Sequence, residues 1–202
     1  MADTAELKTL LSKGEGLFYM KVGTHAGEPI DQIVERKQAE ITRNGFTLWG
    51  YGGSNCHPLT IVQPFAAETA RDGHFRLVME ETHATHFAVD RVATEYSVDG
   101  VHWEEIPDQI AVRGSRYALI IDSLSWTDVK LQLGNMEVVL GPSSGRRGDA
   151  YISGLNDKAC LKVTETRDDP DAETRKITLI ATVREPYAVF VREKLPTEGM
   201  SL

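Results

Sequence analysis

Residues 29–49 read PIDQIVERKQAEITRNGFTLW, and within this stretch the chain changes from a helical pattern to a strand pattern. Four apolar residues recur at the spacing of one helix face: Ile30, Ile33, Val34 and Ile41. Four charged residues nearby are expected to face water: Glu35, Arg36, Lys37 and Glu40. Pro29 suits a first helical position and Gly45 a C-terminal stop, so we predict a helix over 29–44. A short strand is predicted at 46–49.

Strand-like runs dominate the rest of the chain. They are rich in β-branched and aromatic residues and are bounded by turn residues. The predicted strands cover 16–22, 74–81, 86–98, 101–106, 117–124, 129–133, 137–140, 159–164, 177–183 and 187–192. Asp99-Gly100 between two of these runs is a strong hairpin signal, because both turn positions tolerate positive φ. A polar turn containing His25 is predicted at 23–28.

The segment 58–72 allows two interpretations. Leu59–Gln63 is a strand followed by a break at Pro64, or Pro58 opens a helix in which Pro64 makes a kink. A proline inside a helix costs about 3 kcal/mol or more. We therefore favour the break, with a short helix over 65–72.

These elements predict an α+β fold, in which early helices pack on a largely antiparallel sheet or a partly open β-barrel. The two interrupting loops, 142–149 and 167–173, are too short for domain linkers, so residues 1–202 are expected to form a single domain. A short amphipathic helix is expected at 4–13, with Leu7, Leu10 and Leu11 on one face. A flexible tail is expected from about residue 195.

Composition and charge exclude several classes of protein. The chain is 41% hydrophobic and 26% charged, as globular proteins are. Its net charge of −8 disfavours broad non-specific DNA binding but leaves room for a local basic pocket. The two cysteines lie far apart, the N-terminus lacks a signal-peptide core, and no apolar run reaches the roughly 18–20 residues of a membrane span. We expect a soluble, cytoplasmic protein with reduced thiols and no membrane partner.

The glycine-rich segment 50–58, GYGGSNCHP, is the first candidate ligand site. Gly52 and Gly53 allow close approach to the backbone, and Trp49 and Tyr51 offer flat rings for stacking on a base. The glycine spacing matches neither the Walker motif nor the dinucleotide fingerprint. The alternative is a tight strand exit whose aromatic side chains belong to the core.

Cys56 and His57 in the same segment are candidate catalytic residues. A cysteine becomes a nucleophile when a nearby base, cation or helix N-terminus favours its thiolate. The alternative is a buried, inert cysteine. His83 and His86 could share a metal on a helix or turn, but on a strand they face opposite sides. We therefore assign no metal ligands, and the sequence leaves the identity of any cofactor open.

The segment 143–148, SSGRRG, is the second candidate ligand site. The planar forks of Arg146 and Arg147 match phosphate or carboxylate, and the hydroxyls of Ser143 and Ser144 add donors. The alternative is a solvated loop tip.

These features favour a binding or regulatory domain for a small anionic, phosphate-bearing ligand, such as a nucleotide or a short nucleic acid. We expect this ligand to lie between segments 50–58 and 143–148. Two other classes stay open. One is a hydrolase or transferase that uses Cys56 with a histidine, or a histidine-bound metal. The other is a structural or interaction protein that pairs an exposed strand with a partner.

Cys56 is expected to react with a thiol reagent before Cys160. Cys56 lies in a glycine-rich loop, whereas Cys160 lies at the start of an apolar, alternating strand. Labelling of the native protein followed by peptide mapping measures the order. If Cys160 reacts first, or Cys56 stays silent until the protein unfolds, Cys56 is not a nucleophile.

Overall fold

The computed structural model describes residues 11–52, 59–86, 91–139, 141–153, 156–167 and 169–194. Nine strands in these residues are β1 (Gly16–His25), β2 (Thr47–Tyr51), β3 (His74–His86), β4 (Glu95–Ser97), β5 (Glu104–Glu105), β6 (Tyr117–Leu131), β7 (Met136–Val138), β8 (Lys158–Val163) and β9 (Arg175–Arg192). The helices are α2 (Ile30–Asn44), α3 (Leu59–Thr69) and α4 (Gly148–Ile152), with single 3-10 turns at Leu133–Asn135 and Gly141–Ser143.

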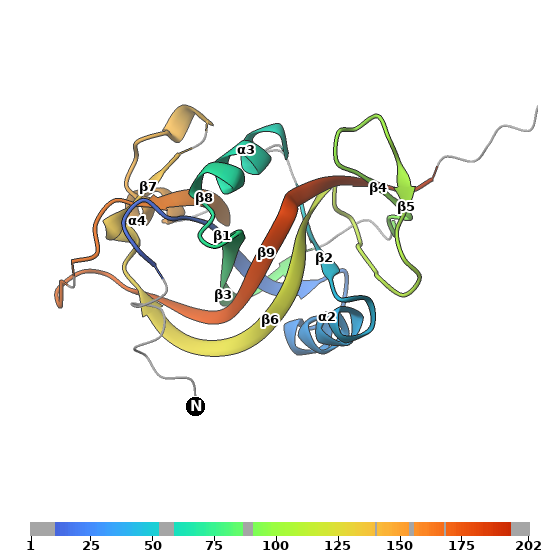
Figure 1. Cartoon of the computed structure of the whole chain (residues 1–202). Helices are drawn as coiled ribbons and strands as arrows, with labels where there is room; N and C mark the ends of the chain where they lie inside the picture. Colours follow the sequence, from blue (N-terminus) through green and yellow to red (C-terminus); the bar gives the residue numbers. More distant parts are fainter. Residues whose placement is uncertain are drawn as a thin grey trace, which may run out of the picture.

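The strands form one open, mixed sheet in the order β2-β6-β9-β3-β1-β8-β7 (Figure 1). β4 is attached to β9, and β5 to β4. β1 and β3 are parallel, and the other strand pairs described are antiparallel. The prediction of a mixed fold with a largely antiparallel sheet is confirmed at this level, and the sheet is not closed into a barrel.

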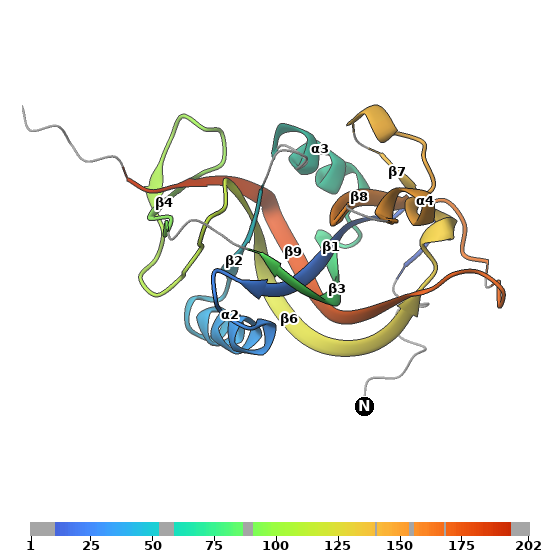
Figure 2. The ribbon, with the colours of Figure 1, turned by 180° about the vertical axis from the view of Figure 1, so that it is seen from behind.

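β6 and β9 are long, strongly curved strands that run side by side (Figures 1 and 2). Each replaces two predicted strands. Register shifts in the β6–β9 pairing, for example between Trp126 and Val129, let the ribbon bend while its pairing continues. The polar residues around the shifts look like strand ends in the sequence, which explains the wrong division.

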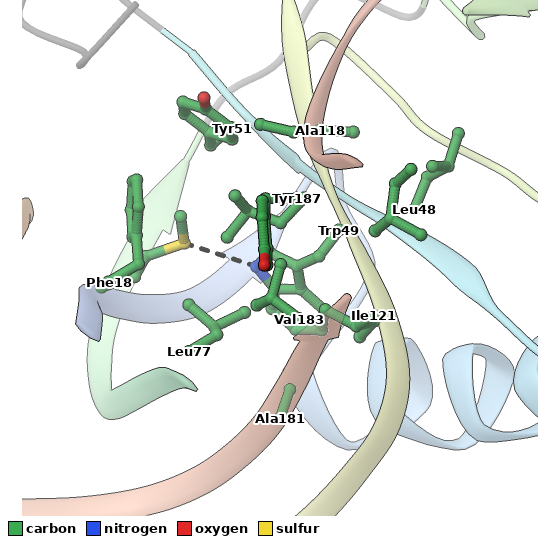
Figure 3. Packing of buried hydrophobic residues seen from close by; sticks show 14 of the residues in the cluster. Phe18, Leu48, Trp49, Tyr51, Leu77, Ala118, Ile121, Ala181, Val183 and Tyr187 are labelled. Atoms are coloured by element: carbon green, nitrogen blue, oxygen red, sulfur yellow. Dashed lines mark hydrogen bonds between the residues drawn. The ribbon is translucent and has the colours of Figure 1, made fainter. Parts of the chain in front are cut away.

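β1 is buried on both faces and separates two apolar clusters. Phe18 and Met20 point into a cluster that includes residues of α2 and α3. Figure 3 shows part of this cluster. Leu17 and Tyr19 point into a second cluster with β7, β8 and α4. Each fully buried large side chain contributes roughly 1.5–3 kcal/mol.

The helix predicted at 29–44 is confirmed as α2. Pro29 is its N-cap, and Gly45 ends it at φ 76° with its N–H donating to Ile41 O at 2.8 Å. Ile33 and Val34 are buried as expected. The exposure predicted for Lys37 and Glu40 is wrong, because both are buried. They continue the three-and-four-residue spacing of the apolar face and so lie against the core.

The break predicted at Pro64 is also wrong, because α3 runs from Leu59 to Thr69 through this proline. Pro64 is the sixth residue of the helix, so its missing N–H would have paired with Thr60, close to the helix start. Burial of Val62 and Phe65 in the core offsets the lost hydrogen bond.

Several other boundaries differ from the prediction, and the strand predicted at 74–81 continues to His86 as β3. β1 extends to His25, so the turn narrows to Ala26 and Gly27, both with positive φ. Strand 86–98 shrinks to β4, with residues 87–90 outside the described part of the chain. Strand 101–106 shrinks to β5.

The Asp99-Gly100 hairpin is confirmed as the connection between β4 and β5, although the link spans residues 98–103 instead of two. Gly100 has φ 79°. One Asp99 carboxylate oxygen accepts the N–H groups of Val101 and His102, each at 2.8 Å. The turn is therefore held by its own side chain.

The helix predicted at 4–13 falls mostly on residues 1–10, and the tail predicted from 195 falls on residues 195–202. Both stretches lie outside the described residues. Leu11 is described and is buried in the second cluster. Among the described residues, no helix has the length and apolar character needed to cross a bilayer.

Val34→Asp is expected to lower the free energy of unfolding by about 3–5 kcal/mol. It removes an apolar side chain worth roughly 1.5–3 kcal/mol and buries a polar group at a cost of about 1–3 kcal/mol. Ala39→Asp, on the exposed face of the same helix, is the matched control and should lose less than about 1 kcal/mol. Urea unfolding measures both, and equal losses would contradict the assigned face.

Candidate functional site

A small pocket lies between β1, β2, α2 and an irregular segment, residues 109–115, which we call the strap. Its volume is about 100 Å³. The lining combines apolar and charged groups: Met20, Lys21, Val22, Gly23, His25, Glu28, Ile30, Ile33, Arg36, Lys37, Trp49, Gly50, Ala111, Val112, Arg113 and Ser115. The Lys21 ammonium donates to the carbonyl of Ile152, which belongs to the second cluster on the opposite face of the sheet.

Trp49 forms part of the apolar wall and is only 6% exposed. Its indole N–H donates to the sulfur of Met20 at 3.4 Å, the dashed contact in Figure 3. Gly50 is required beside it, because a Cβ there would lie 2.4 Å from the hydroxyl oxygen of Ser115. This glycine lets the strap pack against β2.

A buried ionic network holds the strap to α2. Lys37 and Glu40 are 3% and 2% exposed. The Lys37 ammonium donates to Glu40 Oε2 at 2.8 Å, to Thr47 Oγ1 at 3.3 Å and to the Ala111 carbonyl at 2.7 Å, which uses all three of its N–H groups. Glu40 Oε1 accepts the Ala111 N–H at 3.2 Å. Burial lowers the pKa of Lys37 to about 8, although Glu40 opposes the shift.

Arg36 completes the network. Its Nε and Nη2 donate to the two oxygens of Glu28 at 3.0 and 2.6 Å, a bidentate pair. Its Nη1 donates to Glu40 at 2.9 Å and to the Ala111 carbonyl at 3.2 Å. The hydrogen bond to Arg36 lowers the pKa of Glu28, against the raising effect of burial. Two cations are thus matched by two carboxylates.

Arg113 is a charged residue of the pocket lining that takes no part in this network. Its Nε is buried and has no hydrogen-bond partner among the described residues. Its charge reaches Glu28, whose pKa it helps to lower, but Glu28 is already paired with Arg36. The lining contains no further carboxylate. The Arg113 carbonyl accepts hydrogen bonds from His25 Nε2 at 3.0 Å and from Ser115 Oγ at 3.2 Å.

The structure brings Trp49 and Gly50 to this pocket, whereas Tyr51 and Gly52 take part in the packing of the chain itself. Tyr51 is buried in the core, with ring centroids 5.1 Å from Phe18 and 5.5 Å from Tyr117. Gly52 packs against the residue that precedes β6, since a Cβ at this position would lie 3.1 Å from the backbone nitrogen of Arg116. The remaining predicted residues of the segment, Gly53, Cys56 and His57, lie outside the described residues.

The predicted anion loop lies at the other end of the sheet. Ser143, Ser144, Arg146 and Arg147 adjoin β7, whereas Trp49 is in β2, at the opposite end of the strand order. Figures 1 and 2 show the two strands well apart. The Arg147 guanidinium forms a bidentate pair with Asp149 at 2.6 and 3.2 Å, and Arg146 is exposed. The described parts of the two predicted segments do not form one site.

In the described part of the chain, the cysteine and histidine side chains do not come together in one site. Within that part, no three His, Cys, Asp or Glu side chains are grouped as metal ligands. His83 is exposed on β3, and the exposed ring of His102 pairs with Asp99 at 2.6 Å. Cys160 is fully buried, and burial raises the pKa of its thiol. This thiol is therefore protected from reaction.

Two larger hollows carry balanced charge. One, of about 400 Å³, lies between the ends of β6 and β8 and the segment 165–174, where two cations and two carboxylates alternate. The other, of about 230 Å³, has Arg71 paired with Glu15 at 3.1 Å. The pocket beneath the strap differs because Arg113, a half-buried cation with a buried Nε, has no acidic partner of its own among the described residues.

Sequence reasoning missed most of this pocket. The spacing of Lys37 and Glu40 on the apolar face of α2 was a usable signal. Arg113 and His25 gave none, since Arg113 lies in an irregular segment and His25, at the end of β1, is 88 residues away in the sequence. Comparison with protein-family models, with curated proteins and with solved structures finds no match to this chain.

Lys37→Met is expected to lower the free energy of unfolding by about 3–5 kcal/mol, because it leaves the buried Glu40 with one cation fewer. Adding Glu40→Leu should recover part of the loss, since an apolar pair of similar size avoids the desolvation of both charges. Urea unfolding of the two single variants and the double variant measures the coupling. Strictly additive losses would show that the two side chains act independently.

The stability of the Lys37→Met variant should also differ from that of wild type in its dependence on pH. The pKa of Lys37 falls from its ordinary 10.5 to about 8 in the folded state, so the unfolded chain holds more protons between these values. Stability from this group therefore rises with pH across that window. The stability difference between wild type and Lys37→Met should grow from about pH 8 to about pH 10.5. If this difference in stability did not change with pH, the pKa of Lys37 would not be lowered in the folded state.

Proposed function

We propose that the pocket beneath the strap binds a small organic anion, with Arg113 as its counter-charge, and that the protein is a binding or regulatory domain. The Arg113 Nε carries the proposal, because it is a buried donor that has no partner in the described part of the chain, beside the matched pairs Arg36–Glu28 and Lys37–Glu40. Buried donors are nearly always paired with protein, ordered water or ligand. A carboxylate suits this position because it accepts from a guanidinium with both oxygens.

The size of the pocket favours a ligand of few atoms. Its volume is about 100 Å³, several times the roughly 10–15 Å³ that one water needs. Sites for drug-sized ligands have about 300–1,000 Å³. The pocket therefore supports a short organic acid better than the nucleotide or oligonucleotide expected from the sequence. Val22, Ile33 and Trp49 would cover the carbon part of the acid.

The charge balance favours a monoanion. Glu28 and Glu40 neutralise Arg36 and Lys37, so one positive charge remains for the ligand. A dianion would add an unmatched negative charge in a region of low dielectric, which is unfavourable. A cytoplasmic location is part of the proposal, since Cys160 is a free, buried thiol, as expected in a reducing compartment.

Arg113→Met is expected to weaken binding of short carboxylates by about 10- to 100-fold. A hydrogen bond to a charged group is worth about 1.5–3 kcal/mol, and methionine keeps much of the side-chain length. Calorimetric titration of acetate, propionate, inorganic phosphate and a nucleotide into both proteins measures the effect. Ligand-dependent thermal shifts give an independent reading, because binding to the folded state alone stabilises it.

Arg147→Met is the matched control, since Arg147 is an exposed arginine whose acidic partner is on the surface. It should leave carboxylate binding unchanged. Binding that depends on Arg147 and not on Arg113 would move the anion site to the 143–147 loop. Failure of every short carboxylate to bind wild type would overturn the proposal.

A further inference from the structure

His25 is held rigidly at the edge of the pocket. It ends β1 and exchanges backbone hydrogen bonds with Glu28, at 3.0 and 2.9 Å, across the tight turn made by Ala26 and Gly27. Both turn residues have positive φ, 51° and 79°, as the tightest hairpins require. The imidazole is fixed in turn, because its Nε2 contacts the Arg113 carbonyl at 3.0 Å.

This contact determines which ring nitrogen a ligand can meet. A carbonyl oxygen only accepts hydrogen bonds, so Nε2 carries the proton in the contact with Arg113. In the neutral imidazole, Nδ1 is then a bare acceptor. It has no hydrogen-bond partner among the described residues, where the Arg113 carbonyl is the single contact of the ring.

Most other charged groups of the lining are already paired. All three N–H groups of Lys37 are used, and the Glu28 carboxylate is closed by the bidentate pair with Arg36. The Ser115 hydroxyl donates to the Arg113 carbonyl. Arg113 is thus the charged donor left for a ligand, and His25 Nδ1 is an acceptor left beside it, since both residues line the same small pocket.

We propose that the ligand is a small hydroxycarboxylate, whose carboxylate pairs with Arg113 and whose hydroxyl donates to His25 Nδ1. This rests on the proposed function, since it specifies the acid bound in the same pocket. In a volume of about 100 Å³ the hydroxyl must lie within a few bonds of the carboxylate, so a 2-hydroxy acid is the smallest fit. A 2-oxo acid would set a carbonyl lone pair against that of Nδ1, and an unsubstituted acid would leave Nδ1 unpaired.

Lactate, pyruvate and propionate form a matched set of probes, because they share a three-carbon skeleton and differ at one position. Wild type should bind lactate at least about 10-fold more tightly than the other two, since a site built for a hydroxyl rejects analogues that lack it. Titration calorimetry with each acid at one pH and ionic strength measures the ratios. Tighter binding of pyruvate or propionate than of lactate would overturn the inference.

His25→Leu removes the acceptor, whereas glutamine would keep one in its amide oxygen. Lactate affinity should fall by about 10-fold to the level of propionate, and propionate affinity should not change. Leucine also loses the donor to the Arg113 carbonyl, so the unchanged propionate affinity checks that the strap is intact. A lactate preference that survives in His25→Leu would assign the hydroxyl to another group and refute the role of His25.

The outcomes separate the two proposals. If the three acids bind wild type equally and all lose affinity in Arg113→Met, the hydroxyl inference fails and the anion pocket stands. If none of the three binds wild type, the anion pocket fails and the hydroxycarboxylate inference fails with it.

Discussion

Ala111 has both of its backbone hydrogen-bonding groups held by charged side chains of α2. Its carbonyl accepts from Lys37 at 2.7 Å and from Arg36 at 3.2 Å, and its N–H donates to Glu40 at 3.2 Å. Removing these charges from water is costly, and the cost is offset only when every donor and acceptor is satisfied. A shift of the strap by one residue would leave a buried charge unpaired, so the network selects one register. Apolar contacts lack this directionality.

The position of the strap on α2 determines how the pocket is lined and how the chain enters the edge of the sheet. With Ala111 fixed, Val112 and Arg113 line the pocket, and Ser115 comes against Gly50 of β2. The chain then enters β6 at Tyr117, which is the residue paired with Tyr51 of β2. Glycine at position 50 is the complementary requirement, because any larger residue would push the strap away. The hydrogen bonds between Ala111 and the charged side chains of α2, together with the absence of a Cβ at Gly50, thus set the distance between the walls of the pocket.

Local signals in the sequence were sufficient for α2, whose ends depend on Pro29 and Gly45, and for the mixed, largely antiparallel character of the sheet. They failed where tertiary packing outweighed a local preference. Pro64 is accepted inside α3 because the apolar face of that helix is buried. Lys37 and Glu40 have the spacing of core residues, but their charge favoured an exposed position. An acid and a base three residues apart within an apolar stripe are better read as a buried pair.

The glycine-rich segment shows that a sequence signal for a ligand site can have another physical cause. Its glycines suggested close approach of a ligand, and Trp49 and Gly50 do line the pocket, but Gly50 and Gly52 make room for the chain itself. The polar chemistry comes from Arg113, which has no acidic partner of its own among the described residues: Ser115, two residues on, gives its hydroxyl to the Arg113 carbonyl. A carboxylate there would pair the guanidinium and stabilise the fold, and it would also occupy the pocket. Natural proteins retain such unmatched groups mainly at sites of function, since selection for stability alone would remove them. The unpaired Nε of Arg113 is therefore better evidence of a ligand than any sequence motif in the chain.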